Sequence, residues 1–314
     1  MSQKAVKSVH TYIQNDLALV DFDYADSTGR YLASIKEFDL NNNIVKEIGY
    51  RPDGWIENHY TNKYNDKNQR IEHSIFDEDS QLMEMHKFDY DDTGKVIGEA
   101  CYYAEMDDSD YTHYVYDGDL LIEKRNMDSD NELYMLIKFS YTDKLLTHEE
   151  HYNDEMKLES EKTFEYNADG KLVAEIIIDH LENDKHSHKY EYDDAGHRIK
   201  SLLYNKKDQL AVKTLFEYDD QGRNITLIDE DVHGISTTRY TYGDSGQMML
   251  QEKFNEDEEL LVKWEYEYLG EELIKTTTYI REKSEEKSES EEESDEEFEM
   301  AKRVTTEYEY EFFE

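Results

Sequence analysis

Aromatic side chains alternate with polar ones in short segments that recur along the chain. Phe164 and Tyr166 fall on one face of such a segment, while Thr163 and Glu165 fall on the other. An alternation with a period of two residues predicts a half-buried β-strand. Each segment ends in a turn signal of the type Asp-Asp-x-Gly, in which Asp bonds the downstream backbone and Gly supplies a positive φ. The pattern therefore predicts antiparallel hairpins.

The second strand of each predicted hairpin is richer in aliphatic residues, as in residues 96–102 and 171–178. It ends at a second turn signal, in which an aromatic residue precedes Asn or Asp, as at Tyr152-Asn153 and Phe254-Asn255. Two strands and two reversals per unit predict a continuous antiparallel meander with on the order of twenty strands or more.

The second aromatic residue of each unit, here called the anchor aromatic, recurs at a nearly constant interval. Nine of the eleven intervals between successive anchors are 24 to 26 residues long. A fixed period in this range indicates a repeat architecture. We therefore predict an all-β protein of tandem β-hairpin repeats, each about 26 residues long. The anchors are Tyr24, Tyr50, Tyr64, Tyr90, Tyr116, Tyr141, Tyr166, Tyr192, Tyr218, Tyr242, Tyr268 and Tyr310.

A long meander cannot stay flat, because adjacent strands twist against one another with a fixed hand. A coiled or spiralling sheet and a propeller built from pairs of units are the two arrangements that bury the aromatic face. A propeller blade needs a unit of about 40–50 residues, and no stronger similarity occurs at doubled spacing, so we expect the coiled sheet. Its last strand, which ends at Phe312-Phe313, is expected to be an edge protected by alternating Glu residues.

Two intervals depart from the period. The interval from Tyr50 to Tyr64 is 14 residues long, which predicts a missing or truncated second hairpin. The interval from Tyr268 to Tyr310 is 42 residues long and contains a run of Glu, Ser and Lys without an apolar pattern. Such a run predicts a disordered acidic loop. The predicted organisation is a hairpin-repeat body over 1–281, an acidic loop over 282–299 and a final strand over 300–314.

Composition narrows the functional classes. The net charge of −42 argues against binding to nucleic acid or anionic lipid and favours a basic protein partner. A single cysteine cannot form an intramolecular disulfide. No signal peptide and no apolar run of about 18 residues is evident. We therefore expect a cytoplasmic protein without a membrane partner.

The turn Tyr-Asp-x-x-Gly-Arg/Lys resembles the YD repeat of RHS and teneurin-type proteins. It recurs best at 90–95, 166–171, 192–198 and 218–223, and the units together span about residues 12 to 314. The resemblance implies a spiralling β-sheet wall that acts as a shell or scaffold instead of a catalyst. Large members of the family enclose a toxin domain, and this chain has too few repeats for such an enclosure. In repeat style it is similar to short hairpin-repeat proteins, such as MORN-type antitoxins, that serve as immunity partners of toxins.

Few residues in the sequence are arranged like a metal-binding or catalytic site. The segment from Asp89 to Gly94 begins like a calcium loop, but Ala100 stands where a bidentate Glu is required, and turn chemistry explains the repeated aspartates. His186 and His188 share one strand face and with a carboxylate would make a zinc site; solvent-facing histidines are the alternative. No phosphate loop, nucleophile elbow or Cys-x-x-Cys pair occurs. We expect no cofactor, no metal and no enzymatic activity.

The sequence favours an acidic, non-enzymatic protein-binding repeat protein. The most specific form of this prediction is an immunity protein or chaperone that neutralises a basic toxin or effector by electrostatic steering and occlusion. A carbohydrate- or peptide-binding module that uses exposed aromatics, and a structural spacer without a ligand, are the alternatives. The predicted protein-binding residues are Trp55, Glu149, Glu150, Asp193, Asp194, Asp219 and Asp220.

Overall fold

A computed structural model describes residues 4–15, 29–283 and 298–314 of the chain. These residues form only strands and turns, which confirms the all-β class and the hairpin repeats. The 22 described strands are β1 (Val6–Asn15), β2 (Arg30–Phe38), β3 (Ile44–Tyr50), β4 (Ile56–Tyr64), β5 (Arg70–Phe76), β6 (Leu82–Tyr90), β7 (Val96–Tyr103), β8 (Asp108–Asp117), β9 (Leu120–Met127), β10 (Leu133–Thr142), β11 (Leu145–Asn153), β12 (Leu158–Tyr166), β13 (Leu172–Asp179), β14 (Asp184–Tyr192), β15 (Arg198–Tyr204), β16 (Leu210–Tyr218), β17 (Asn224–Asp231), β18 (Gly234–Tyr242), β19 (Met248–Phe254), β20 (Leu260–Leu269), β21 (Glu272–Lys283) and β22 (Phe298–Phe312).

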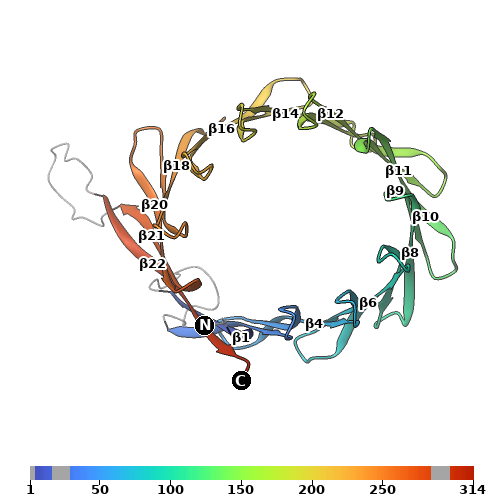
Figure 1. Ribbon diagram of the computed structural model, residues 1–314, viewed down its shortest axis with the longest axis horizontal. Coiled ribbons are helices and arrows are strands. Elements are labelled where there is room, and N and C mark those ends of the chain that lie inside the picture. The colour runs from blue at the N-terminus through green and yellow to red at the C-terminus, as the bar shows by residue number, and fades with distance from the viewer. Residues whose placement is uncertain (1–3, 16–28, 284–297) are drawn as a thin grey trace, which may run out of the picture. The chain divides into compact units, whose positions relative to one another are not determined.

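The strands fall into two compact units, each described by itself below. Unit 1 comprises residues 1–35, 50–55 and 214–314, and unit 2 comprises residues 36–49 and 56–213. In unit 2 the strands from β4 to β15 pair antiparallel, each with the next one along the chain. Figure 1 shows these strands in sequence order, with turns at alternating strand ends.

The turns explain the recurring Asp and Asn. In the turn after β6, the Asp91 carboxylate accepts the backbone N–H groups of Thr93 and Lys95, both at 2.9 Å, and Gly94 adopts a φ of 94°. One short acceptor thus satisfies two donors that the reversal leaves unpaired. In seven other turns, the side-chain oxygen of the first turn residue likewise accepts the backbone N–H groups of the residues two and four positions later. These turn residues are Asp39, Asn65, Asp77, Asn167, Asn205, Asp219 and Asn255.

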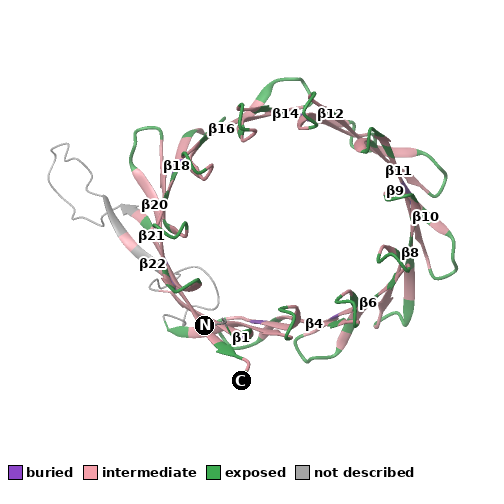
Figure 2. Ribbon diagram, in the orientation of Figure 1, coloured by how far each residue is buried: buried purple, intermediate pink, exposed green. Residues whose placement is uncertain are grey.

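The sheet has very little apolar core. Among the described residues, the buried hydrophobic side chains are Leu136 and Ile137, and no large side chain is fully buried. Most strand residues are half-buried whichever face they occupy, as Figure 2 shows. Within each unit the sheet is therefore a single layer, stabilised by cross-strand pairs on both faces instead of by a packed interior. This arrangement accounts for a folded chain with only 37% hydrophobic residues.

The short interval between Tyr50 and Tyr64 does not mark a lost hairpin, so that prediction is wrong. Tyr50 ends β3, whereas the anchors from Tyr64 to Tyr268 end or nearly end even-numbered strands. Phe38 ends β2 and precedes Tyr64 by the regular 26 positions. Tyr50 has the anchor residue type but lies at the opposite end of its hairpin.

The prediction of a coiled or spiralling sheet whose last strand is an edge is also wrong. In unit 1, β22 pairs with β21 on one side and antiparallel with β1 on the other, from Val6↔Phe312 to Asn15↔Val304. Figure 1 shows the first strand beside the last one. The unpaired N–H and C=O groups of an edge strand find partners in this way, so no free edge is left for the Glu residues to protect.

Residues 284–297 of the predicted acidic loop lie outside the described residues. The strands on either side continue to Lys283 and begin at Phe298, and these two residues are in register. Tyr24 also lies outside the described residues.

Candidate functional site

Two of the predicted binding residues are turn residues. Asp219 accepts the backbone N–H of Arg223 and of Gln221, both at 2.9 Å, and the Arg223 backbone N–H is the main reason why the pKa of Asp219 is lowered. Asp193 accepts the backbone N–H of His197 at 2.7 Å in the corresponding turn. Their carboxylates are occupied by the chain itself, so both residues have a structural role.

Asp194 and Asp220 follow these two turn residues and are exposed. Within the described part of the chain, neither carboxylate has a recorded hydrogen bond or ion pair. Both are available to a cationic partner. They belong to different units, Asp194 to unit 2 and Asp220 to unit 1.

Glu149 and Glu150 are adjacent on β11 and therefore point to opposite faces of the sheet. Glu149 is half-buried and contacts His151 Nε2 at 2.6 Å and Lys162 Nζ at 3.1 Å. Its charge is locally compensated. Glu150 lies directly opposite Glu161 on β12 and opposite Lys138 on β10. The pair does not form one acidic site.

Trp55 is 55% exposed and ends the turn between β3 and β4. Its backbone N–H donates to the Asp53 carboxylate at 3.1 Å, and its carbonyl accepts the Arg51 N–H at 2.9 Å. Among the described residues, no hydrogen bond joins Trp55 to the predicted acidic residues. The seven predicted residues are divided between the two units, with Trp55, Asp219 and Asp220 in unit 1 and the other four in unit 2.

Exposed carboxylates one residue before several of the anchors were not among the predicted binding residues. Glu165 and Glu191 occupy this position on β12 and β14 in unit 2, and both are exposed. Asp169 and Asp194 are exposed in the turns that follow. The signal was present, because the residue before an anchor must point to the face opposite the anchor. In unit 1, Glu217 and Glu267 hold the same position.

A groove in unit 2 has mainly basic side chains among its charged lining residues, in contrast to the exposed carboxylates described above. It has a volume of about 570 Å³, and its charged and titratable lining residues are Lys185, Lys206, Lys207, His186, His188 and one carboxylate, Asp184. Lys185 pairs with Asp208 at 3.1 Å across neighbouring turns. The groove is a local cationic surface in a strongly acidic chain.

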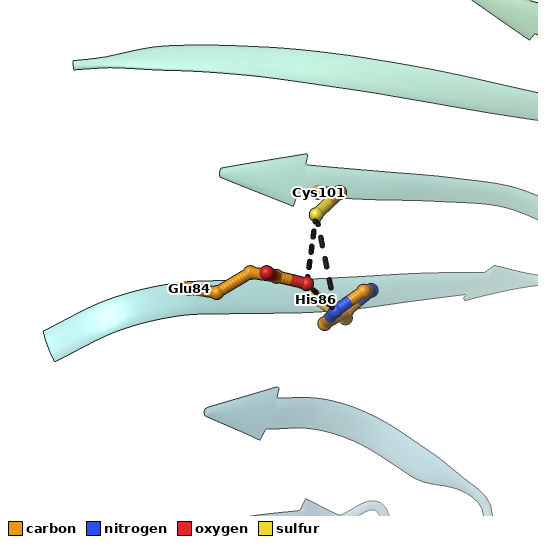
Figure 3. A group of neighbouring side chains, drawn as sticks. All are labelled: Glu84, His86 and Cys101. Carbon is orange, nitrogen blue, oxygen red and sulfur yellow. Dashed lines mark hydrogen bonds and ion pairs between the residues drawn. The ribbon is translucent and has the colours of Figure 1, made fainter. Parts of the chain in front are cut away.

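A Glu–His–Cys cluster lies on β6 and β7, as Figure 3 shows. Glu84 and His86 are an even number of residues before the anchor Tyr90 on β6 and therefore share its face. His86 Nε2 lies 2.5 Å from Glu84 Oε1 and 3.8 Å from Cys101 Sγ. The Cys101 thiol donates to Glu84 Oε1 at 3.4 Å. Register places His86 directly opposite Cys101, and Glu84 is two residues before His86 on the same face.

Further contacts hold this cluster in position. His86 Nδ1 lies 2.8 Å from Glu99 Oε1, and the Tyr114 hydroxyl donates to Glu99 Oε2 at 3.0 Å. Burial raises the pKa of the Cys101 thiol to about 11; a hydrogen bond with Tyr103 opposes this shift, and the hydrogen bond to Glu84 adds to it. The thiol is therefore protonated at neutral pH.

The two histidines considered for zinc in the sequence analysis are less well placed. The rings of His186 and His188 are 5.9 Å apart, and the nearest carboxylate oxygen recorded for His186 is that of Asp184, at 3.9 Å. Among the described residues, the one group of three potential ligand atoms within 4.8 Å of one another is Glu84, His86 and Cys101. Strand register brings these residues together, and no spacing motif in the sequence signals it.

Comparisons with known proteins give weak structural likenesses. No family model matches the chain, and no curated protein matches it. The crystal structure of TcdB2-TccC3 without its hypervariable C-terminal region covers 82% of this chain with a TM-score of 0.31 and 10% identity, and a second structure of TcdB2-TccC3 gives 0.28 and 12%. The chain spans 17% and 20% of those chains. A porin-like protein from Bacteroides uniformis covers 98% of this chain with a TM-score of 0.33 and 8% identity.

The cytoplasmic location was wrongly inferred from the sequence. The inference rested on the single cysteine, on the lack of a signal peptide and on the lack of an apolar run of about 18 residues. The last of these is a criterion for helices, whereas the described residues form strands.

The described residues contain no helix that is long and apolar enough to cross a membrane.

Proposed function

We propose that this chain is a non-enzymatic protein-binding scaffold that binds a basic polypeptide at the acidic ends of its strands. The observation that carries the proposal is the set of exposed carboxylates Glu165, Asp169, Glu191 and Asp194, here called the acidic row. All four lie in unit 2, beside two consecutive anchors.

The spacing of the acidic row suits an extended partner. Glu165 and Glu191 lie on the same face, two strands apart, and are offset by two residues along the strand, because Glu165 is in register with Ala174 and Ala174 with Lys189. Strand spacing and rise place their backbones about 10–12 Å apart. Basic side chains three to four residues apart on an extended segment cover the same distance.

Part of the acidic row has no internal counter-charge. Glu191 pairs with Lys200 at 2.8 Å. For Glu165, Asp169 and Asp194, no ion pair is recorded within the described part of the chain. A cationic partner would therefore gain pairing without first displacing an intramolecular one. The net charge of −42 would add long-range steering, which salt screens.

In its most specific form, the proposal assigns the partner to basic toxins or effectors and this chain to their immunity proteins or chaperones. Support comes from the acidic charge and from the resemblance of the repeat to hairpin-repeat immunity proteins. Binding would occlude the cationic surface that such a toxin needs to reach its own target. Exposed aromatic side chains would supply local anchors.

The test measures binding of an arginine-rich peptide to the full chain across a salt series. Neutralising the acidic row (Glu165→Gln, Asp169→Asn, Glu191→Gln and Asp194→Asn) should weaken binding about tenfold or more at low salt, because each exposed pair contributes about 0.2–1 kcal/mol. The matched control removes four exposed carboxylates from the opposite strand ends of the same unit, with Glu78→Gln, Asp130→Asn, Glu155→Gln and Glu182→Gln.

Equal losses in the two variants would mean that only overall charge matters and would remove the acidic row as the binding surface. Binding that is indifferent to salt would contradict the electrostatic mechanism altogether. A carbohydrate- or peptide-binding module predicts instead that ligand quenches the fluorescence of the exposed Trp55. A spacer predicts no binding in either assay.

A further inference from the structure

We propose that Glu84, His86 and Cys101 form a binding site for a zinc-class divalent metal ion. The three side chains offer one oxygen, one nitrogen and one sulfur atom, all within 4.8 Å of one another. Zinc binds this combination of donors, usually with tetrahedral geometry. The site is independent of the basic partner proposed above.

The spacing of the three donor atoms is close to that of a metal site. Bonds of about 2.0–2.3 Å in a tetrahedral zinc site place the ligand atoms about 3.3–3.8 Å apart. Cys101 Sγ already lies 3.4 Å from Glu84 Oε1 and 3.8 Å from His86 Nε2. Only the contact of 2.5 Å between Glu84 and His86 has to open, by about 1 Å. The metal ion would take the place of the hydrogen atoms in the hydrogen bonds that now join Glu84, His86 and Cys101.

The imidazole is oriented as metal-ligating histidines usually are. A histidine ligand generally donates its second ring N–H to a carboxylate, which fixes the tautomer and the ring plane. His86 Nδ1 lies 2.8 Å from Glu99 Oε1, and Tyr114 in turn fixes Glu99 with a bond of 3.0 Å. Nε2 therefore points toward Glu84 and Cys101, as Figure 3 shows.

The repeat itself does not require these residues. The position four residues before the anchor holds His86 on β6 and His188 on β14, but Tyr60, Thr112, Ile137 and Lys162 on β4, β8, β10 and β12. Cys101 is the single cysteine of the chain. The turns and the tyrosine anchors account for the fold without this cluster, so a structural role does not explain it.

Register places one further carboxylate on the same face, outside the group of donor atoms that lie within 4.8 Å of one another. Asp110 on β8 lies directly opposite Cys101 and therefore shares its face. A carboxylate at this position would complete a four-ligand site, and water would complete a three-ligand one. Thiolate and imidazole select zinc-class ions over magnesium and calcium, which prefer oxygen.

A catalytic thiol is the competing interpretation, because Cys101, His86 and Glu99 have the order of a nucleophile, a base and an orienting acid. The geometry argues against it. His86 Nε2 contacts Glu84 at 2.5 Å and is 3.8 Å from the thiol, and Glu84 accepts the thiol hydrogen. A carboxylate beside the sulfur disfavours the thiolate that a nucleophile needs.

The experiment titrates the reduced full chain with Co²⁺ and then displaces it with Zn²⁺, in excess Mg²⁺ to occupy the surface carboxylates. We expect one equivalent of bound cobalt, a thiolate-to-cobalt charge-transfer band, and loss of that band on addition of zinc. Cys101→Ser should abolish the band. Glu99→Gln, which leaves all proposed ligands in place, should weaken binding about 10–100-fold. The control His188→Asn should change neither property.

Several outcomes would overturn the assignment. Binding without the charge-transfer band, or binding unchanged in Cys101→Ser, would show that surface carboxylates hold the metal. An unchanged affinity in Glu99→Gln would contradict the oriented His86 imidazole on which the assignment rests. Rapid alkylation of Cys101 by iodoacetamide that zinc does not slow would favour the catalytic thiol. Circular dichroism of each variant establishes that loss of metal is not loss of fold.

Discussion

The Tyr166 hydroxyl donates to the backbone carbonyl of Leu146 at 2.8 Å, and the bond links the end of one hairpin to the start of the strand before it. The same bond joins Tyr90 to Arg70, Tyr116 to Val96 and Tyr192 to Leu172, always across 20 residues. In each case the carbonyl lies at or beside the first residue of an odd-numbered strand, where a turn has just ended. The anchor residue is therefore specified by its hydroxyl as well as by its ring.

Removing one such hydroxyl should destabilise the chain. We expect Tyr166→Phe to lower the free energy of unfolding by about 1 kcal/mol, because it leaves a partly buried carbonyl without its donor. Tyr111→Phe is the control, since Tyr111 is 38% exposed and is not an anchor. Urea unfolding of the two variants measures the difference. Equal stabilities would mean that the anchor contributes only through its ring.

Backbone conformation in the turns gives a second prediction. Met156 has a φ of 60°, which costs a residue with a Cβ atom about 1 kcal/mol. Met156→Gly should therefore stabilise the chain by about 0.5–1 kcal/mol, because Met156 is 48% exposed and loses little contact.

The reverse substitution introduces a Cβ atom at a glycine with positive φ. Gly170 has a φ of 76°, and the Cβ atom of Gly170→Ala would contact only Leu145, at 3.9 Å. It should destabilise by about 1 kcal/mol through backbone strain alone. Thermal unfolding of both variants checks the pair, and shifts of the same sign would contradict the explanation.

We expect His59 to make a contribution to the free energy of unfolding that changes with pH. Its ring stacks on Phe76 with centroids 4.7 Å apart, and both ring nitrogens are without a partner among the described residues. Burial, with a smaller effect from Lys46, lowers the pKa of His59 below its ordinary value of 6.5. The unfolded chain therefore takes up a proton at a higher pH than the folded chain does, so this contribution is present above pH 6.5 and is lost as the pH falls below it.

Comparison with His59→Phe isolates this effect from the carboxylates, which both chains share. The stability difference between wild type and variant should shift in favour of the variant between pH 7 and pH 5.5, by about 1 kcal/mol or less. Urea midpoints at the two pH values provide the measurement. A constant difference would show that His59 titrates alike in the folded and unfolded chains.

The pairing of the terminal strands predicts a pattern of hydrogen exchange. In an edge strand only alternate backbone amides are protected, because the others face solvent. β22 has partners on both sides over Val304 to Glu307, so consecutive amides in this stretch should all exchange slowly. Residue-resolved exchange by NMR tests this, and fast exchange of the alternate amides that face β1 would restore an open edge.

Local patterns in the sequence determined the hairpins. The two-residue alternation, the Asp or Asn at the start of each turn and the period near 26 residues each describe contacts made within one repeat. Asp91 and Gly94 show why such prediction succeeds, because the bonds that form their turn span four residues. The wrong prediction of a truncated hairpin between Tyr50 and Tyr64 has the same origin. A local pattern gives the residue type, but it does not show at which end of a hairpin a tyrosine lies.

Only the tertiary structure decided what joins residues distant in the chain. The pairing of Val9 with Tyr310 spans 301 positions of sequence, and no local signal encodes it. The Glu–His–Cys cluster likewise depends on register, since a slip of one residue between β6 and β7 would move Cys101 to the other face. The sequence by itself determined a strongly acidic chain of repeated hairpins. Pairing and register, which depend on hydrogen bonds between separate strands, decided which side chains meet.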